Sequence, residues 1–276
     1  MSGNGAGVDV VQVDAHAHVM RRDAPLASER HSAPKYDVSA ADFLSLLDRH
    51  RISHGVLTAP SFYGADNSLL LAALAEAPER LRGTAIVAPD IAREALAEMD
   101  CQGIVGIRLN WFRRHELPDV TSPEYASLFA AVRDLGWHVE VYLEGSKLAG
   151  VLPRLRASGA TIVVDHFGSP DPALRVACGG FREVLAGVRA GDTFVKLSAP
   201  YRLGGADPQA YVDALLDAGG PGQLVWASDF PFVGFEDSVA YADCVALLAQ
   251  WIPDAATRRI VAATTPAALF RFDTPT

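Results

Sequence analysis

The sequence has few cysteines, a deficit of basic charge and no long apolar run, and each shortage excludes a class of protein. Its three cysteines, Cys101, Cys178 and Cys244, are odd in number and widely spaced, which indicates neither a disulfide framework nor a zinc ribbon. The net charge of −9 argues against nucleic-acid and membrane-surface partners, because both need a basic face. No apolar run approaches the roughly 18 residues that a membrane-spanning helix requires.

The N-terminal residues also lack the pattern of a targeting signal. Residues 1–7 are small and polar, whereas a secretory signal peptide has a basic start followed by an apolar stretch. We therefore expect a flexible tail over residues 1–7 and a cytoplasmic location. The glycines at positions 3, 5 and 7 precede the first expected strand, whereas the glycines of a dinucleotide-binding loop follow a strand.

Apolar, β-branched segments are abundant and are separated by helical patterns. With 276 residues and 50% hydrophobic content, the chain can bury one large core, as α/β barrels of about 250 residues do. Eight segments bounded by Gly, Pro or Asp are typical of buried parallel strands. They are residues 9–16, 54–59, 83–88, 104–110, 137–143, 161–166, 193–198 and 223–229.

The intervening segments predict helices and, with the strands, an α/β fold. One helix has Ser39 as its N-cap with Asp42 three positions later, and another begins at Ser122-Pro123 and stops at Gly136. A doubly wound open sheet would fit this alternation as well. However, the polar motifs fall at C-terminal ends of strands that are far apart in sequence, and only a closed barrel brings all of these ends together. We therefore predict a single (β/α)8 TIM-barrel domain over residues 1–276.

Three histidines and one aspartate lie at the expected mouth of this barrel. His16 and His18 lie at the end of the first strand on the same side of it, His166 ends the sixth strand, and Asp229 ends the eighth. Polar groups at the ends of apolar strands are costly to bury without partners, and these residues can be partners for one another. The set can form either a metal cage or a metal-free acid/base site.

Arginines follow the same ends of other strands. Arg108 lies at the end of the fourth strand, Arg113 and Arg114 lie in the loop after it, and Arg202 lies just beyond the seventh. Each alone is typical of a solvated surface. Together, on one rim of an acidic protein, they indicate recognition of a carboxylate, which the planar guanidinium binds with two hydrogen bonds.

Further polar residues near these strand ends can have purely structural roles. Asp66 and Asn67 can cap the helix that follows them, and Tyr142 can be a core residue with a satisfied hydroxyl. Lys196 lies inside the seventh strand and can point inward to pair with a barrel carboxylate. No nucleophile elbow surrounds Ser198 or Ser228. We expect surface or structural roles for the remaining histidines, which are His31, His50, His54, His115 and His138.

At these motifs the sequence resembles the amidohydrolase superfamily, and within it the group of lactonases similar to 2-pyrone-4,6-dicarboxylate lactonase. The similarity extends over nearly the whole chain. In combination the motifs are highly specific for this group. They are Asp14-Ala15-His16-Ala17-His18, the segment 60–67, Gly106-Ile107-Arg108-Leu109-Asn110, Asp165-His166-Phe167-Gly168, Lys196-Leu197-Ser198 and the segment 226–231.

The resemblance implies a hydrolase that opens a small anionic lactone without a required cofactor. It implies that Asp229 activates water without a bound metal and that His16, His18 and His166 line the site. It also implies that the substrate carries a carboxylate held by five residues. These are Ser61, Arg108, Arg114, Tyr142 and Arg202.

The chain departs from the group at two positions, and more than one function is compatible with its motifs. Ser169 stands where the group has an arginine after Asp-His-Met-Gly, and Phe232 stands where a histidine is common. A single divalent zinc ion could be bound by the three histidines and Asp229. A binuclear centre would need a lysine on the fourth strand and a histidine on the fifth, where this chain has Arg108 and Tyr142. A metal-dependent decarboxylase and a non-catalytic binding barrel are also compatible with this set of residues.

Overall fold

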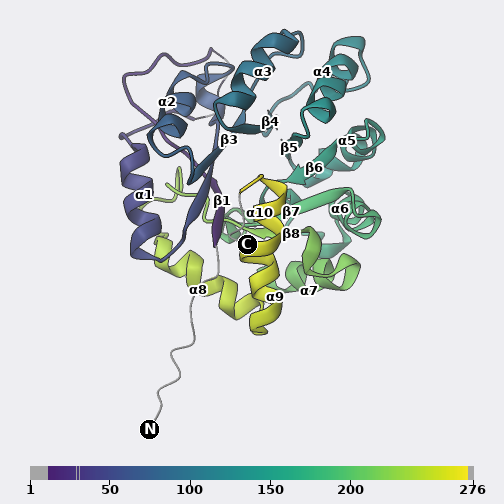
Figure 1. The fold of residues 1–276 in the computed structure, drawn as a ribbon. Helices are drawn as coiled ribbons and strands as arrows, with labels where there is room; N and C mark the ends of the chain where they lie inside the picture. Colours follow the sequence, from purple (N-terminus) through teal and green to yellow (C-terminus); the bar gives the residue numbers. More distant parts are fainter. Residues whose placement is uncertain (1–11, 29, 31, 273–276) are drawn as a thin grey trace.

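Eight parallel strands form a barrel at the centre of the molecule, with helices in a ring around it (Figure 1). The structure is a computed structural model that describes residues 12–28, 30 and 32–272, so the tail expected at 1–7 and His31 lie outside the described residues. Each strand pairs with the next in sequence, which confirms the predicted (β/α)8 barrel. The strands are β1 (Val13–Ala17), β2 (His54–Thr58), β3 (Leu81–Ala85), β4 (Ile104–Asn110), β5 (His138–Tyr142), β6 (Thr161–Val164), β7 (Thr193–Leu197) and β8 (Leu224–Trp226).

Helices follow the strands as the alternating pattern predicts. The α-helices are α1 (Ala40–Arg49), α2 (Ser68–Glu76), α3 (Arg93–Cys101), α4 (Pro123–Asp134), α5 (Gly145–Ala157), α6 (Gly179–Ala190), α7 (Pro208–Gly219), α8 (Tyr241–Trp251), α9 (Ala255–Arg259) and α10 (Thr265–Leu269). Short helical turns are η1 (Ser61–Tyr63), η2 (His166–Gly168), η3 (Arg175–Ala177), η4 (Pro200–Arg202), η5 (Pro221–Gln223) and η6 (Ile260–Thr264). Among the described residues, none of the helices is both long and apolar enough to cross a bilayer.

Local hydrogen bonds decide where several elements begin and end. The capping box predicted for α1 is present, because the backbone N–H of Asp42 donates to Ser39 Oγ and the N–H of Ser39 donates to Asp42 Oδ2. Strand β3 lies two to three residues before the predicted 83–88. Its backbone leaves the sheet after Ala85, because the amide of Asn67 hydrogen-bonds the N–H and the carbonyl of Ile86. Asn67 therefore anchors this loop and makes no side-chain cap of α2.

The barrel separates an outer apolar core from a polar interior. On β5, Val139 and Val141 belong to the large apolar cluster that strands and helices share, whereas Glu140 and Tyr142 alternate with them. A second apolar cluster lies at the other end of the strands, where Phe270, the residue that caps the C-terminus of α10, packs with residues such as Val13 and Val105. Helix α10 therefore closes one end of the barrel, and the polar residues lie toward the opposite end (Figure 1).

The carboxylate of Asp14 joins the first strand to the loop after the last strand. Its Oδ1 accepts hydrogen bonds from the backbone N–H groups of Ser228 and His16, and its Oδ2 accepts from Ser228 Oγ and the Tyr241 hydroxyl. Burial raises the pKa of Asp14 to about 6 although these donors favour the charged form. Beside it the backbones of Ala17 and Phe230 form a parallel bridge, so backbone and side chain together close the barrel.

Candidate active site

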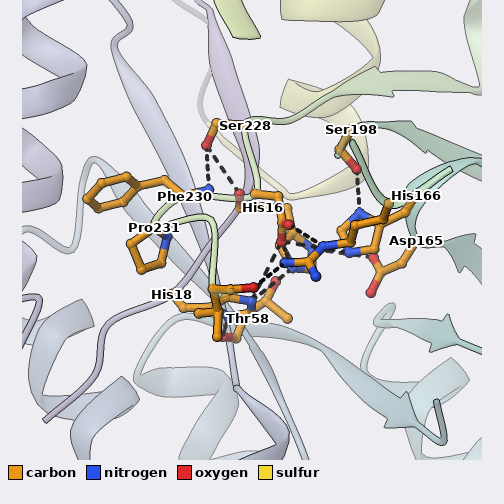
Figure 2. A network of polar contacts seen from close by, with 12 residues as sticks. His16, His18, Thr58, Asp165, His166, Ser198, Ser228, Phe230 and Pro231 are labelled. Atoms are coloured by element: carbon orange, nitrogen blue, oxygen red, sulfur yellow. Dashed lines mark hydrogen bonds and ion pairs between the residues drawn. The ribbon is translucent and has the colours of Figure 1, made fainter. Parts of the chain in front are cut away.

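The structure brings together the three histidines and the aspartate that the sequence places at strand ends. Asp229 Oδ1 lies 3.6 Å from His16 Nε2, 3.7 Å from His166 Nε2 and 3.9 Å from His18 Nε2. Figure 2 shows His16 between His18 and His166, and its ring centroid is 4.8 and 5.0 Å from theirs. Strands β1, β6 and β8 are far apart in sequence, so closure of the barrel creates this site.

Two of these residues have strained backbones at the ends of their strands. His166 has φ of 48° and Asp229 has φ of 64°, in the left-handed region that residues other than glycine seldom adopt. The Asp229 turn is held by its N–H, which donates to the His16 carbonyl, and by the Phe232 N–H, which donates to the Asp229 carbonyl. Such strain is concentrated at functional sites, because it fixes a side chain where relaxed backbone would not place it.

The two oxygens of Asp229 have different partners. Oδ2 accepts hydrogen bonds from the Tyr201 hydroxyl at 2.7 Å and from Arg202 Nε at 2.8 Å. Burial opposes ionisation of Asp229, but the positive charge of Arg202 outweighs it and holds the pKa well below its usual range. Asp229 is therefore a carboxylate at neutral pH, and its Oδ1 faces the histidines.

The three histidines are neutral at pH 7. Burial lowers the pKa of His18 and of His166 to about 4, and it holds the pKa of His16 well below its usual value. His18 Nδ1 lies 2.7 Å from the Thr58 carbonyl, so Nδ1 carries the proton and Nε2 has a lone pair. His166 Nδ1 lies 2.8 Å from Ser198 Oγ, and a hydroxyl can accept or donate there.

His16 has the opposite tautomer to His18. Its Nδ1 lies 2.9 Å from Lys196 Nζ and 3.3 Å from Asp165 Oδ1. The shorter contact is to an ammonium group, which can only donate, so we assign the ring proton to Nε2. This tautomer agrees with the one assigned to His18, because His16 Nε2–H can donate to the lone pair of His18 Nε2 at 3.3 Å.

The position of the ring proton on His16 determines whether these side chains could bind zinc. His16, His166 and Asp229 offer ligand atoms within 4.8 Å of one another, a spacing that a metal ion could bridge. A metal must bind a lone pair, however, and His16 Nε2 directs a proton toward the others. The residues as the structure arranges them therefore do not fit a metal held by all four side chains.

Two buried ion pairs lie directly beneath the histidines. Lys196 forms an ion pair with Glu140 Oε2, which confirms the prediction of an inward lysine paired with a barrel carboxylate. Arg108 contacts Asp165 Oδ2 at 2.8 Å through NH2 and Glu140 Oε1 at 3.1 Å through Nε. The formal charges of the four groups sum to zero, which offsets part of the cost of burying them. Burial raises the pKa of Glu140 to about 7.

The predicted substrate-binding residues occupy different positions around the mouth. Ser61, Tyr142 and Arg202 line a cavity of about 300 Å³ together with His18, His166 and Asp229. Arg108 reaches the same cavity, but its side chain is only 3% exposed and its NH1 donates to the Ala59 carbonyl. Arg114 lines a neighbouring cavity of about 530 Å³, which Ser61 also lines. The roles expected of these residues in holding a substrate stay predictions.

Aromatic rings shape the cavity in ways the motifs did not indicate. Phe112 stacks on Tyr142 with ring centroids 4.6 Å apart, and Arg202 lies over the rings of Tyr201 and Phe235. Phe232, which replaces the histidine common in the group, packs against Tyr201. Apart from Tyr142 at the end of β5, these rings come from loops of irregular spacing, and no sequence pattern marks them as neighbours.

Neither Glu140 nor Tyr201 is predicted from the sequence to belong to the site. A carboxylate between Val139 and Val141 in a buried strand is a signal that could have identified Glu140, because such a group requires a partner. Tyr201 lies beside Arg202 in the loop after β7, but its hydrogen bond to Asp229 joins residues 28 positions apart. No local pattern predicts that contact.

His138 lies deeper in the barrel and provides a pH-dependent prediction. Burial lowers its pKa from 6.5 to about 3, and Gly106 leaves space for its ring, since a Cβ there would lie 2.4 Å from it. Between these values the unfolded chain binds a proton that the native state does not. The contribution of neutral His138 to the free energy of unfolding is therefore present above pH 6.5 and is lost as the pH falls toward 3.

We expect His138→Gln to weaken the acid sensitivity of folding. Urea titrations at pH 7 and pH 5 should show that the variant loses about 2 kcal/mol less unfolding free energy on acidification than the parent does. The exposed His115 gives a matched control, because His115→Gln should leave the difference between the two pH values unchanged. Equal acid sensitivity in the parent and His138→Gln would show that His138 is protonated in the native state.

The barrel and its rim of histidines and carboxylate define a class of hydrolytic (β/α)8 enzymes. Comparisons with known proteins agree: the family profile described as amidohydrolase matches residues 13–272. The chain belongs to the amidohydrolase family and is a hydrolase.

Curated relatives and solved structures match most of the chain. It is 30% identical over 241 residues to a 2-pyrone-4,6-dicarboxylate hydrolase of Comamonas testosteroni, covering 82% of this chain and 78% of that protein. It is 26% identical to a 4-sulfomuconolactone hydrolase of Rhizobium radiobacter, covering 93% and 89%. A crystal structure from Pseudomonas putida, described as a 2-pyrone-4,6-dicarboxylic acid hydrolase, superimposes with a TM-score of 0.89 at 35% identity, covering 96% of this chain and 99% of that one.

Proposed function

We propose that the protein hydrolyses a small, negatively charged lactone at the cavity around Asp229. The observation that carries this proposal is that the two oxygens of Asp229 have different partners. Oδ2 accepts hydrogen bonds from Tyr201 and Arg202, whereas Oδ1 faces three neutral histidines. The names of the relatives support it, since both describe enzymes that act on anionic lactones. The mixed basic and aromatic lining of the cavity suits a flat ring that bears a carboxylate.

In this mechanism Asp229 is the general base. A water molecule beside Oδ1 gives a proton to the carboxylate while its oxygen attacks the ring carbonyl carbon. His16 Nε2–H donates a hydrogen bond to the negative oxygen of the tetrahedral intermediate. His166 Nε2 donates to it as well when its Nδ1 accepts from Ser198 Oγ, and His18, whose Nε2 has a lone pair, lines the site. The bond between the carbonyl carbon and the ring oxygen then breaks, and the proton passes to the departing oxygen. The products are a carboxylic acid and an alcohol or enol on one open chain, and no step requires a metal.

Arg202 links substrate binding to the strength of the base. In the structure it pairs with Asp229, which stabilises the carboxylate and so weakens it as a proton acceptor. A substrate carboxylate on the cavity side of Arg202 would share its positive charge. We propose that binding of an anionic lactone thereby raises the basicity of Asp229 at the time of reaction. Ser61, Arg108, Arg114 and Tyr142 are proposed to complete the substrate site.

We expect Arg202→Met to discriminate between charged and neutral substrates. Loss of a charge-assisted hydrogen bond worth about 1.5–3 kcal/mol should lower kcat/KM for carboxylate-bearing lactones by about 10- to 100-fold. Because Arg202 also contacts Asp229, a smaller loss shared by all lactones is expected. The additional loss on charged substrates is the signature, measured as the ratio of kcat/KM for a matched charged and neutral pair.

Arg93 offers a matched control for this experiment. It lies on α3, half-exposed and paired with Asp134, and it does not line the cavity. Arg93→Met should leave the charged-to-neutral ratio unchanged. If Arg202→Met lowers kcat/KM equally for both substrates, Arg202 positions Asp229 and does not bind the substrate anion.

A further inference from the structure

His16 has two possible partners of opposite chemistry at the same ring nitrogen. Its Nδ1 lies 2.9 Å from Lys196 Nζ, which can only donate, and 3.3 Å from Asp165 Oδ1, which can only accept. All three side chains are fully buried. The first contact places the ring proton on Nε2, facing the cavity, whereas the second would place it on Nδ1 and leave a lone pair on Nε2.

Asp165 is arranged to hold the alternative tautomer. Its Oδ2 binds Arg108, but its buried Oδ1 accepts no hydrogen bond among the described residues and lies 3.4 Å from Lys196. A histidine that binds a metal commonly donates its other N–H to a carboxylate, which orients the ring and raises its basicity. Asp165 occupies that position behind His16.

The other groups around the cavity already present metal-binding atoms. His18 keeps a lone pair on Nε2 because its Nδ1 donates to the Thr58 carbonyl, and Asp229 directs Oδ1 inward. Their separations from His16 Nε2, 3.3 and 3.6 Å, are near the spacing of about 3.3 Å between ligands of a tetrahedral zinc ion. The proton on His16 Nε2 opposes zinc binding at this set of atoms.

We propose that Lys196 is a positioning residue that excludes zinc from this site by fixing the tautomer of His16. Its ammonium group occupies Nδ1, so His16 presents an N–H to the cavity as a hydrogen-bond donor. Removal of the ammonium group allows His16 to donate to Asp165, and the same four side chains then become a zinc site. The inference rests on the proposed metal-free hydrolysis and identifies the residue that enforces it.

The test compares Zn²⁺ binding by the parent with binding by Lys196→Met/Glu140→Met. The double substitution removes one positive and one negative charge from the buried cluster, so Arg108 and Asp165 stay balanced, and the single Lys196→Met variant is measured beside it. After treatment with a chelator, calorimetric titration with ZnCl₂ at pH 7 should give a dissociation constant lower by about 100-fold in the double variant than in the parent. Lys147 is partly exposed beside Glu144, and the control Lys147→Met should bind zinc as the parent does.

Nitrogen NMR of the histidine rings provides a second measurement that a purely structural role would not change. We expect His16 to be protonated at Nε2 in the parent and at Nδ1 in the double variant. Adding His18→Gln to the double variant should remove the gain in zinc affinity, which locates the metal at these side chains.

The outcomes separate this inference from the proposed function. Zinc affinity that is equal in the parent and in both Lys196 variants, while the parent hydrolyses lactones without metal, would overturn the role of Lys196 alone. Tight zinc binding by the parent, with activity that disappears on chelation and returns with zinc, would instead overturn the metal-free mechanism. Protonation of His16 at Nδ1 in the parent would also contradict the inference.

Discussion

Asp229→Asn is expected to reduce kcat by at least about 100-fold on any lactone that the parent hydrolyses. An amide has nearly the same size but cannot take a proton from water. The variant should fold normally, because the amide oxygen can accept from Tyr201 and Arg202 while the amide NH₂ faces the lone pair of His18 Nε2. Steady-state kinetics, together with thermal unfolding, would separate loss of the base from loss of structure.

A matched control lies in the same loop. Asp237 is exposed, and Asp237→Asn makes the same chemical change away from the cavity, so it should leave kcat unchanged. Near-parental turnover by Asp229→Asn would reject Asp229 as the base. A loss of turnover accompanied by unfolding would instead identify the residue as a structural anchor of the loop after β8.

Arg108→Met is expected to lower the unfolding free energy by about 3–5 kcal/mol. The guanidinium is buried between Asp165 and Glu140, and its removal leaves two carboxylates facing the single charge of Lys196. Breaking one side of a buried ion pair is costly because the remaining charge has lost both water and partner. Urea unfolding at pH 7 measures the effect.

Restoring the charge balance should recover part of the lost stability. The double variant Arg108→Met/Asp165→Asn removes the unpaired carboxylate, so it should unfold at a higher urea concentration than Arg108→Met alone. The surface variant Arg93→Met should change the unfolding free energy by less than about 0.5 kcal/mol. A similarly small change for Arg108→Met would show that water enters the cluster and solvates its carboxylates.

The sequence predicted the barrel well because burial leaves a regular trace. A strand with both faces covered is apolar throughout, and β4 occupies the predicted residues 104–110. The end of β3 was wrong because a side-chain amide, that of Asn67, takes hydrogen bonds that another strand would otherwise provide. Such long-range competition leaves no periodic signal.

For the site as well, the sequence indicated residues with a local pattern but not the long-range contacts between side chains. The residues gathered around Asp229 could be identified because each directly follows an apolar strand and a barrel brings such ends together. The residues that set the protonation of this group could not be identified from the sequence, because those contacts depend on how far each side chain extends in the folded structure. Lys196 and His16 are 180 positions apart, and neither neighbourhood in the sequence indicates which nitrogen of the ring is protonated.

The hydrogen bonds of Asp14 that help to close the barrel have a consequence for how the chain acquires its structure during synthesis. The ribosome synthesises Asp14 214 positions before its partner Ser228. Contacts this distant require most of the polypeptide to be in place before they form, which slows folding relative to local pairing. Nascent chains that end before β8 lack both Ser228 and Asp229, so we expect hydrolytic capacity to arise only after β8 and the loop that follows it have been synthesised. A truncated product would carry the histidines without the carboxylate they face.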